Sequence, residues 1–194
     1  MDFLEISPHE LECSNAFNMI GKEWFLICAA DAERECGANA MTASWGYLGN
    51  MWNKPSAVCF IRPQRYTYSL AERAERVSLC FFGEGERETF SYFGTKSGKD
   101  GDKAAACGLH YDYIDGVPYI RAAKTVLICR KLYVDDLREE CFTDKSIISS
   151  FYKAGDYHRI YACAIEKVLS AKCKVSENFL ALLGNFHFIK IDFR

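Results

Sequence analysis

Short apolar segments separated by polar turns constrain the fold of this chain more than any other feature. Trp24–Ala30 is apolar and precedes a polar turn, and Ser56–Arg62 holds an uninterrupted Ala-Val-Cys-Phe-Ile run. Runs of this length predict buried strands. Further strands are expected at 39–45, 77–82, 159–169 and 186–193, and within 119–134 around Val126–Cys129. Strand and helix do not alternate regularly, so the sequence predicts an antiparallel barrel, mainly β with peripheral helices, rather than a doubly wound sheet.

The helices are expected as insertions between these strands. The pattern predicts an amphipathic helix over 8–20, a helix over 66–76, and a polar helical region over 84–107 that Gly94, Gly98 and Gly101 interrupt. Another helix is expected over 143–153, with the Thr143 hydroxyl as its N-cap. Gly46 and Gly49 indicate a turn after the second strand. Because the chain shows no repeat or linker, we expect one domain over residues 1–194.

Charge and apolar content exclude several classes of protein. The chain has 24 basic and 26 acidic residues, which gives a net charge of −2 and argues against a dedicated nucleic-acid or anionic-membrane binder. No signal peptide is apparent, and the longest apolar run is too short to span a membrane. The ten cysteines include no C-x-x-C pair, and several lie in apolar runs, where cysteine acts as a small hydrophobe. These features predict a reduced, cytoplasmic protein.

Several well-known chemical motifs are missing from the sequence. It contains neither the G-x-G-x-x-G dinucleotide fingerprint nor the G-x-x-x-x-G-K-[ST] phosphate loop nor H-E-x-x-H. The four histidines, at positions 9, 110, 158 and 187, are far apart, so no metal site is expected.

Two polar segments lie at predicted strand ends. In Asn39–Trp45, the side chains of Asn39, Thr42 and Ser44 supply hydrogen-bond donors and acceptors, although ordinary alternation on a solvent-facing strand would give the same pattern. In Arg62–Thr67, two arginines flank a predicted helix start, where guanidinium groups and free amides suit a phosphate. The alternative is a pair of solvated surface arginines.

Two further segments could contribute to a site. Gly94–Lys103 combines glycines, which let backbone amides approach a ligand, with three lysines that offset Asp100 and Asp102; the alternative is a mobile charged loop. Gly155–His158 is a tight turn that enters a strand and carries an imidazole, whose alternative role is structural.

Together the four segments resemble the flavin reductase-like family, the split-barrel FMN-binding flavoproteins that include flavoredoxin. The resemblance rests on N-A-M-T-A-S-W at 39–45, R-P-Q-R-Y-T at 62–67, G-T-K-S-G-K-D-x-D-K at 94–103 and G-D-Y-H at 155–158. Their order and spacing also match, over about residues 20–170. The resemblance implies a Greek-key split barrel and a homodimer with one noncovalent FMN per subunit near the interface.

The resemblance also implies roles for individual residues. Arg62, Arg65 and Thr67 would hold the phosphate with help from Lys96 and Ser97, and His158 would lie near the exposed face of the flavin ring as the catalytic residue. The family often has arginine where Lys99 stands. The full set of expected cofactor-binding residues is Asn39, Met41, Thr42, Ala43, Ser44, Trp45, Arg62, Arg65, Tyr66, Thr67, Lys96, Ser97, Lys99 and Asp100.

The expected function is hydride transfer from NAD(P)H to bound FMN. The flavin itself carries out such chemistry, so no catalytic triad is needed. Two alternatives remain open. One is a flavoredoxin-like electron carrier that passes electrons to protein partners, because the sequence has no nicotinamide fingerprint. The other is a module that binds flavin or another small ligand without catalysis.

Overall fold

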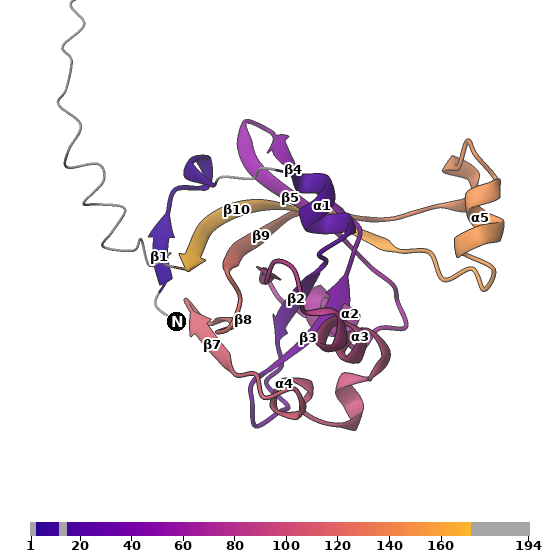
Figure 1. Ribbon diagram of the computed structural model, residues 1–194. Coiled ribbons are helices and arrows are strands. Elements are labelled where there is room, and N and C mark those ends of the chain that lie inside the picture. The colour runs from indigo at the N-terminus through magenta and orange to yellow at the C-terminus, as the bar shows by residue number, and fades with distance from the viewer. Residues whose placement is uncertain (1–2, 12–14, 172–194) are drawn as a thin grey trace, which may run out of the picture.

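The computed structural model describes residues 3–11 and 15–171, which form an eight-stranded antiparallel sheet and a two-stranded hairpin flanked by short helices (Figure 1). The strands are β1 (Phe3–Ile6), β2 (Phe25–Ala30), β3 (Ala38–Ala43), β4 (Gly46–Met51), β5 (Lys54–Ile61), β6 (Arg76–Phe81), β7 (Tyr111–Ile114), β8 (Val117–Ile120), β9 (Thr125–Asp136) and β10 (Arg159–Ala171). The α-helices are α1 (Ala16–Gly21), α2 (Tyr66–Arg73), α3 (Arg87–Thr95), α4 (Lys103–Ala106) and α5 (Ser146–Phe151). The 3-10 helices are η1 (Pro8–Glu10), η2 (Gly98–Asp100) and η3 (Glu139–Cys141).

The sheet has the strand order β3-β2-β6-β9-β10-β5-β4, with β1 paired to β10 and β7–β8 as a separate hairpin. All of these pairings are antiparallel. The sheet coils until β3 contacts β5, but those two strands do not pair, so the barrel stays open. The predicted fold class, a mainly β antiparallel split barrel with peripheral helices, is confirmed.

Strand β2 is buried on both faces, as its uninterrupted apolar run predicts. Its odd-numbered residues Phe25 and Ile27 belong to the core inside the barrel, whereas Leu26 and Cys28 belong to a second core beneath α3 and the β7–β8 hairpin. Neighbouring side chains of a strand point to opposite faces, so a strand between two cores can hold no polar position.

The predicted glycine turn at Gly46 and Gly49 is wrong, because both residues lie within strand β4. A Cβ at Gly46 would lie 2.7 Å from the Val58 carbonyl oxygen, so this glycine allows β4 to approach β5 closely. The chain instead turns at Trp52 and Asn53, which have φ values of +52° and +56°. As an edge strand with much exposed surface, β4 carries no strong apolar pattern.

The predicted helices are shorter in the structure, and the predicted region 119–134 divides into β8 and β9. Among the described residues of the range 8–20, η1 and α1 are the helical ones, while 84–107 contains α3, η2 and α4. Thr143 is not an N-cap: helix α5 begins after Lys145, and the Asp144 carboxylate accepts the Ser146 N–H at 2.9 Å. The strand expected at 186–193 lies outside the described residues.

The segment that connects β9 to β10, residues 137–158, projects from the sheet, and we call it the arm. Helix α5 lies in this arm (Figure 1), and its Phe151 ring is 5.4 Å from the Trp45 ring, centre to centre. Helices α2 and α3 both pack on β2 and β3. None of the helices in the described part of the chain is long and apolar enough to cross a membrane.

Candidate functional site

Two cavities that share Arg65 lie along β3 and contain most of the predicted site residues. The first, here the aromatic cavity, has a volume of about 250 Å³ and is lined by Met41, Thr42, Ala43, Ser44, Trp45, Phe60, Arg62, Arg65 and His158. The second, here the basic cavity, has a volume of about 150 Å³ and is lined by Asn39, Gln64, Arg65, Tyr66, Thr67, Thr95, Lys96, Ser97, Gly98 and Lys103. The structure therefore brings the four sequence segments to one place.

Polar side chains of β3 use their hydrogen bonds to join the strand to the helices. Asn39 Nδ2 donates to Thr67 Oγ1 at 2.8 Å, which links β3 to α2. Thr42 Oγ1 donates to the Phe90 carbonyl at 2.6 Å, which links β3 to α3. A Cβ at Gly98 would lie 2.6 Å from Tyr66 Cδ1 and closer still to Asn39 Oδ1, so only glycine lets η2 close the basic cavity.

Arg65 and Lys103 place two cations in the basic cavity beside the C-terminal end of α3. Arg65 donates to the carbonyls of Gly94 at 2.5 Å and Phe93 at 3.0 Å. Lys103, which is 4% exposed, donates to the carbonyls of Phe93 at 3.3 Å and Lys96 at 3.4 Å. Neither cation forms an ion pair with a carboxylate of the described residues.

Both cations have a lowered pKa, because each is buried to some extent without a carboxylate partner in the described residues. Burial and the nearby Arg65 guanidinium lower the pKa of Lys103 from 10.5 to about 8, and burial lowers the pKa of Arg65. A buried cation without an anionic partner is costly, and an anion placed between the two would stabilise both. The basic cavity is therefore suited to a phosphate or another small anion.

Arg62 has a different environment, although it is only three residues from Arg65. It forms an ion pair with Asp156, donates to the Phe151 carbonyl at 2.9 Å and lies 5.2 Å from the centre of the Tyr152 ring. Gln64 Nε2 also donates to Asp156, at 2.7 Å. The structure thus places Arg62 at the base of the arm with its charge balanced, and outside the basic cavity.

His158 lies in the aromatic cavity among rings. Its ring centre is 4.9 Å from that of Trp45 and 6.4 Å from that of Phe60, and its Nδ1 is 2.8 Å from the Tyr152 hydroxyl oxygen. Burial and the Arg62 charge lower the pKa of His158 to about 4. The imidazole is therefore neutral at pH 7 and acts as a hydrogen-bonding group rather than as a cation.

The remaining predicted residues divide between the cavity and the surface. Ser97 accepts the Lys99 N–H at 3.1 Å and so begins η2. Tyr66 directs its hydroxyl away, to Asp31 at 2.7 Å. Lys99 and Asp100 are exposed and line neither cavity.

Sequence reasoning missed five of the lining residues: Phe60, Gln64, Thr95, Gly98 and Lys103. Lys103 stands in the recognised 94–103 segment but was counted there only as a charge that offsets Asp100 and Asp102. The signal that could have singled it out is the helix start: Asp102 caps α4, which turns the next residue inward. Among the residues that the structure describes, no group of three or more His, Cys, Asp or Glu side chains could hold a metal ion.

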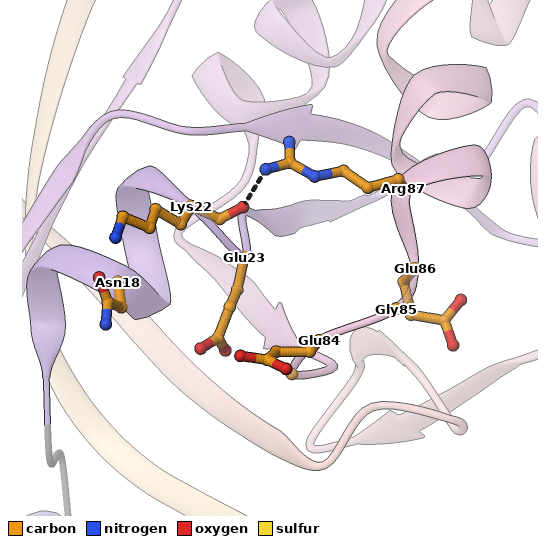
Figure 2. Close-up of a pocket in the computed structure, with 8 residues that line it drawn as sticks. Asn18, Lys22, Glu23, Glu84, Gly85, Glu86 and Arg87 are labelled. Carbon is orange, nitrogen blue, oxygen red and sulfur yellow. Dashed lines mark hydrogen bonds between the residues drawn. The ribbon is translucent and has the colours of Figure 1, made fainter.

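A third cavity, of about 280 Å³, lies between α1 and the Gly83–Arg87 loop (Figure 2). It contains the carboxylates of Glu23, Glu84 and Glu86. Arg87 donates to the Lys22 carbonyl at 2.5 Å and lies 4.0 Å from the centre of the Trp24 ring. Its lining also contains the cations Lys22 and Arg87, and it includes none of the predicted site residues.

Comparisons with known proteins identify the fold and the family of this chain. No curated protein matches the chain. An FMN-binding protein from Thermus thermophilus with bound 1-cyclohex-2-enone is similar in structure, with a TM-score of 0.62 and 19% identity over 87% of this chain and 82% of that one. Flavoredoxin from Methanosarcina acetivorans has a TM-score of 0.58 and 18% identity, over 80% of this chain and 72% of that one. The NADH:FAD oxidoreductase of Streptomyces globisporus has a TM-score of 0.56 and 12% identity, over 77% of this chain and 74% of that one.

These likenesses establish the fold, and a match to a family model establishes the family. The model described as "Flavin reductase like domain" matches residues 20–183, which include both cavities and the arm. The chain belongs to the flavin reductase-like domain family.

Proposed function

We propose that this protein is an FMN-dependent oxidoreductase that transfers hydride from NAD(P)H to bound flavin. The observation that carries the proposal is the pair of half-buried Arg65 and buried Lys103, which lacks a carboxylate partner in the described residues and lies next to a cavity lined by the Trp45, Phe60 and His158 rings. A flavin mononucleotide has the complementary form, since a flat aromatic system ends in a phosphate dianion. Family membership supports the same assignment.

The residues present fit this cofactor from end to end. Lys103 and Arg65 would hold the phosphate, and the backbone and side chains of Met41–Ser44 would lie along the ring system, with Trp45 and His158 at its far end. The basic cavity is small and suits one phosphate, which favours FMN over the dinucleotide FAD. When bound, the flavin supplies the hydride chemistry, whereas the protein binds and orients it and sets its surroundings.

Neutral His158 gives the aromatic cavity a hydrogen-bonding group that carries no charge at pH 7. A neutral imidazole there can hydrogen-bond to a nicotinamide amide or to the reduced ring without attracting a second anion. On this proposal His158 acts on the second substrate, while Lys103 and Arg65 hold the first.

Anaerobic mixing with NADH and NADPH tests the proposal. We expect the purified protein to be yellow or to bind FMN more tightly than riboflavin, and its flavin absorption band to bleach rapidly with one of the two nicotinamides. Slow bleaching together with fast reduction by a reduced carrier protein would support the electron-carrier function instead. Equal affinity for FMN and riboflavin would remove the phosphate assignment, and a lack of redox turnover would leave only a binding module.

We further propose that a second copy of the chain covers the apolar groove beside the site. This groove, of about 690 Å³, lies between α1, β4 and the arm, and it shares Trp45 and Phe60 with the aromatic cavity. Phe17 is 90% exposed and Tyr47 is 68% exposed at its edges. Exposed apolar patches of this kind mark interaction surfaces, and stable homodimers commonly bury about 2,000 Å² or more in total.

Sedimentation at low micromolar concentration tests this dimer. We expect the wild-type protein to sediment as a dimer, and the double variant Phe17→Ser with Tyr47→Ser to sediment as a monomer. Leu4→Ser, which changes an exposed leucine on β1, serves as the control and should remain dimeric. A wild-type monomer would contradict the proposal. We also propose that the chain is one domain and that it works in a reducing compartment such as the cytoplasm, where the described free cysteines would stay reduced.

A further inference from the structure

The hydrogen bond between Tyr152 and His158 connects the arm to the aromatic cavity. Tyr152 follows α5 and is 3% exposed, and its hydroxyl oxygen is 2.8 Å from His158 Nδ1. The same ring lies under the Arg62 guanidinium, which is itself paired with Asp156. The hydroxyl is thus held in place from several sides.

The direction of this hydrogen bond decides which nitrogen of His158 carries the proton. If Nδ1–H donated, the buried Tyr152 hydroxyl hydrogen would have no acceptor in the described part of the chain, at a substantial desolvation cost. If the hydroxyl donates, both groups are satisfied, and the ring proton resides on Nε2. No described residue hydrogen-bonds to Nε2, so its N–H is available to a group in the aromatic cavity.

We propose that Tyr152 is a positioning residue that donates its hydroxyl hydrogen to His158 Nδ1 and thereby holds the imidazole with its Nε2–H available to the cavity. That NAD(P)H or the reduced flavin uses this N–H rests on the proposed function. The protonation state and tautomer of the His158 ring do not rest on it. Arg62 and Asp156 are the charged groups around the imidazole, and the contacts from Trp45 and Phe60 are uncharged.

Nitrogen NMR of the histidine ring in the purified protein, with and without added FMN, reads this state directly. At pH 7 we expect His158 to be neutral with its proton on Nε2, and to titrate well below its ordinary pKa. In Tyr152→Phe we expect the Nδ1-protonated form to increase relative to the other roughly fivefold, the effect of one ordinary hydrogen bond on an equilibrium. The titration midpoint should also rise, because the bond stabilises the neutral ring. The variant His158→Ala identifies the signals.

Tyr157→Phe is the matched control, because the Tyr157 ring packs against Tyr152 but its hydroxyl bonds to the exposed Glu139. It should leave the His158 signals unchanged. A wild-type ring that is charged at pH 7 or protonated on Nδ1 would overturn the proposal even if Tyr152→Phe failed to fold. A folded Tyr152→Phe with wild-type signals would overturn it too.

Kinetics then separate this proposal from the proposed function. With FMN bound, Tyr152→Phe should reduce the rate of flavin reduction by NAD(P)H severalfold and leave FMN affinity unchanged. An absence of reduction in the wild type would count against the proposed function alone, since the NMR result does not depend on it. An unchanged rate in a variant whose ring state had shifted would show that the Nε2–H is not used.

Discussion

Arg62 and Arg65 lie three residues apart at the start of α2, yet their electrostatic environments differ. Arg62 has its carboxylate, Asp156, and joins the sheet to the arm. Arg65 shares a cavity with a second cation, Lys103, and has only carbonyl oxygens as partners in the described residues. The difference teaches that a cation paired with a carboxylate contributes to the stability of the fold, whereas two neighbouring cations without a carboxylate are suited to binding an anionic ligand.

Removal of the unbalanced lysine should have the largest effect on binding. Lys103→Met keeps the length of the side chain but removes the charge-assisted contact proposed for the phosphate, so FMN affinity should fall by about 1.5–3 kcal/mol, or roughly 10- to 150-fold. Riboflavin affinity should stay the same. Quenching of flavin fluorescence measures both values, and Lys99→Met, on the exposed side of the same segment, provides the control.

The same lysine predicts how stability depends on pH in the flavin-free protein. Its pKa is about 8 when folded and 10.5 ordinarily, so between these values the unfolded chain holds a proton that the folded chain has released. The free energy of unfolding should therefore rise with pH across this window. Urea denaturation of wild type and Lys103→Met at several pH values isolates the contribution. Parallel curves for the two proteins would contradict it.

Loss of the balanced arginine should weaken the arm rather than the phosphate contact. Arg62→Met leaves Asp156 without its cation and frees the base of the arm, so the unfolding free energy should fall by about 1–2 kcal/mol. Hydrogen exchange should increase in residues 137–158. The ratio of FMN to riboflavin affinity should not change. A large loss of that ratio would return Arg62 to the role of phosphate ligand that the sequence resemblance implies.

The smallest effect concerns the polar side chains of β3. Thr42→Val removes the hydrogen bond to the Phe90 carbonyl, which should lower the unfolding free energy by about 1 kcal/mol with little effect on FMN affinity. Ser44→Ala is the contrasting variant, because this hydroxyl lines the aromatic cavity without a hydrogen bond to another described residue. Ser44→Ala should change FMN affinity more than the free energy of unfolding. If Thr42→Val affected FMN affinity more and Ser44→Ala affected stability more, Thr42 would be the ligand-binding residue and Ser44 the structural one.

The sequence predicts those parts of the molecule that depend on neighbouring residues. The Trp24–Ala30 run predicts β2, which is buried on both faces as a continuous apolar run requires. The Ser56–Arg62 run predicts β5, of which Ala57, Cys59 and Ile61 are buried in the core, whereas Val58 and Phe60 on the other face are partly exposed. Likewise, the four polar segments meet at one place because each lies beside a strand end of a single sheet. Strand β4 was missed because an edge strand needs little apolar surface.

What the sequence does not predict depends on residues that are distant in the chain. Asp156 is far from Arg62 in sequence, and nothing local to Arg62–Thr67 indicates which arginine will be paired. Burial of Lys103 depends in the same way on the packing of α3, α4 and β3 around it. Charge balance at a site is therefore a tertiary property, even where the residue types that make it are visible in the sequence.

The carbonyl groups that receive Arg65 and Lys103 have a consequence for how a ligand is exchanged. The C-terminal end of a helix carries about half a negative charge, so α3 offers the two cations a partial counter-charge that is always present. A carboxylate in that position would compete with an incoming phosphate and would have to be displaced. The partial charge of helix α3 instead stabilises the two cations in the ligand-free protein, and it leaves most of their positive charge to attract a phosphate. This arrangement suits a cofactor that binds reversibly, without a covalent bond.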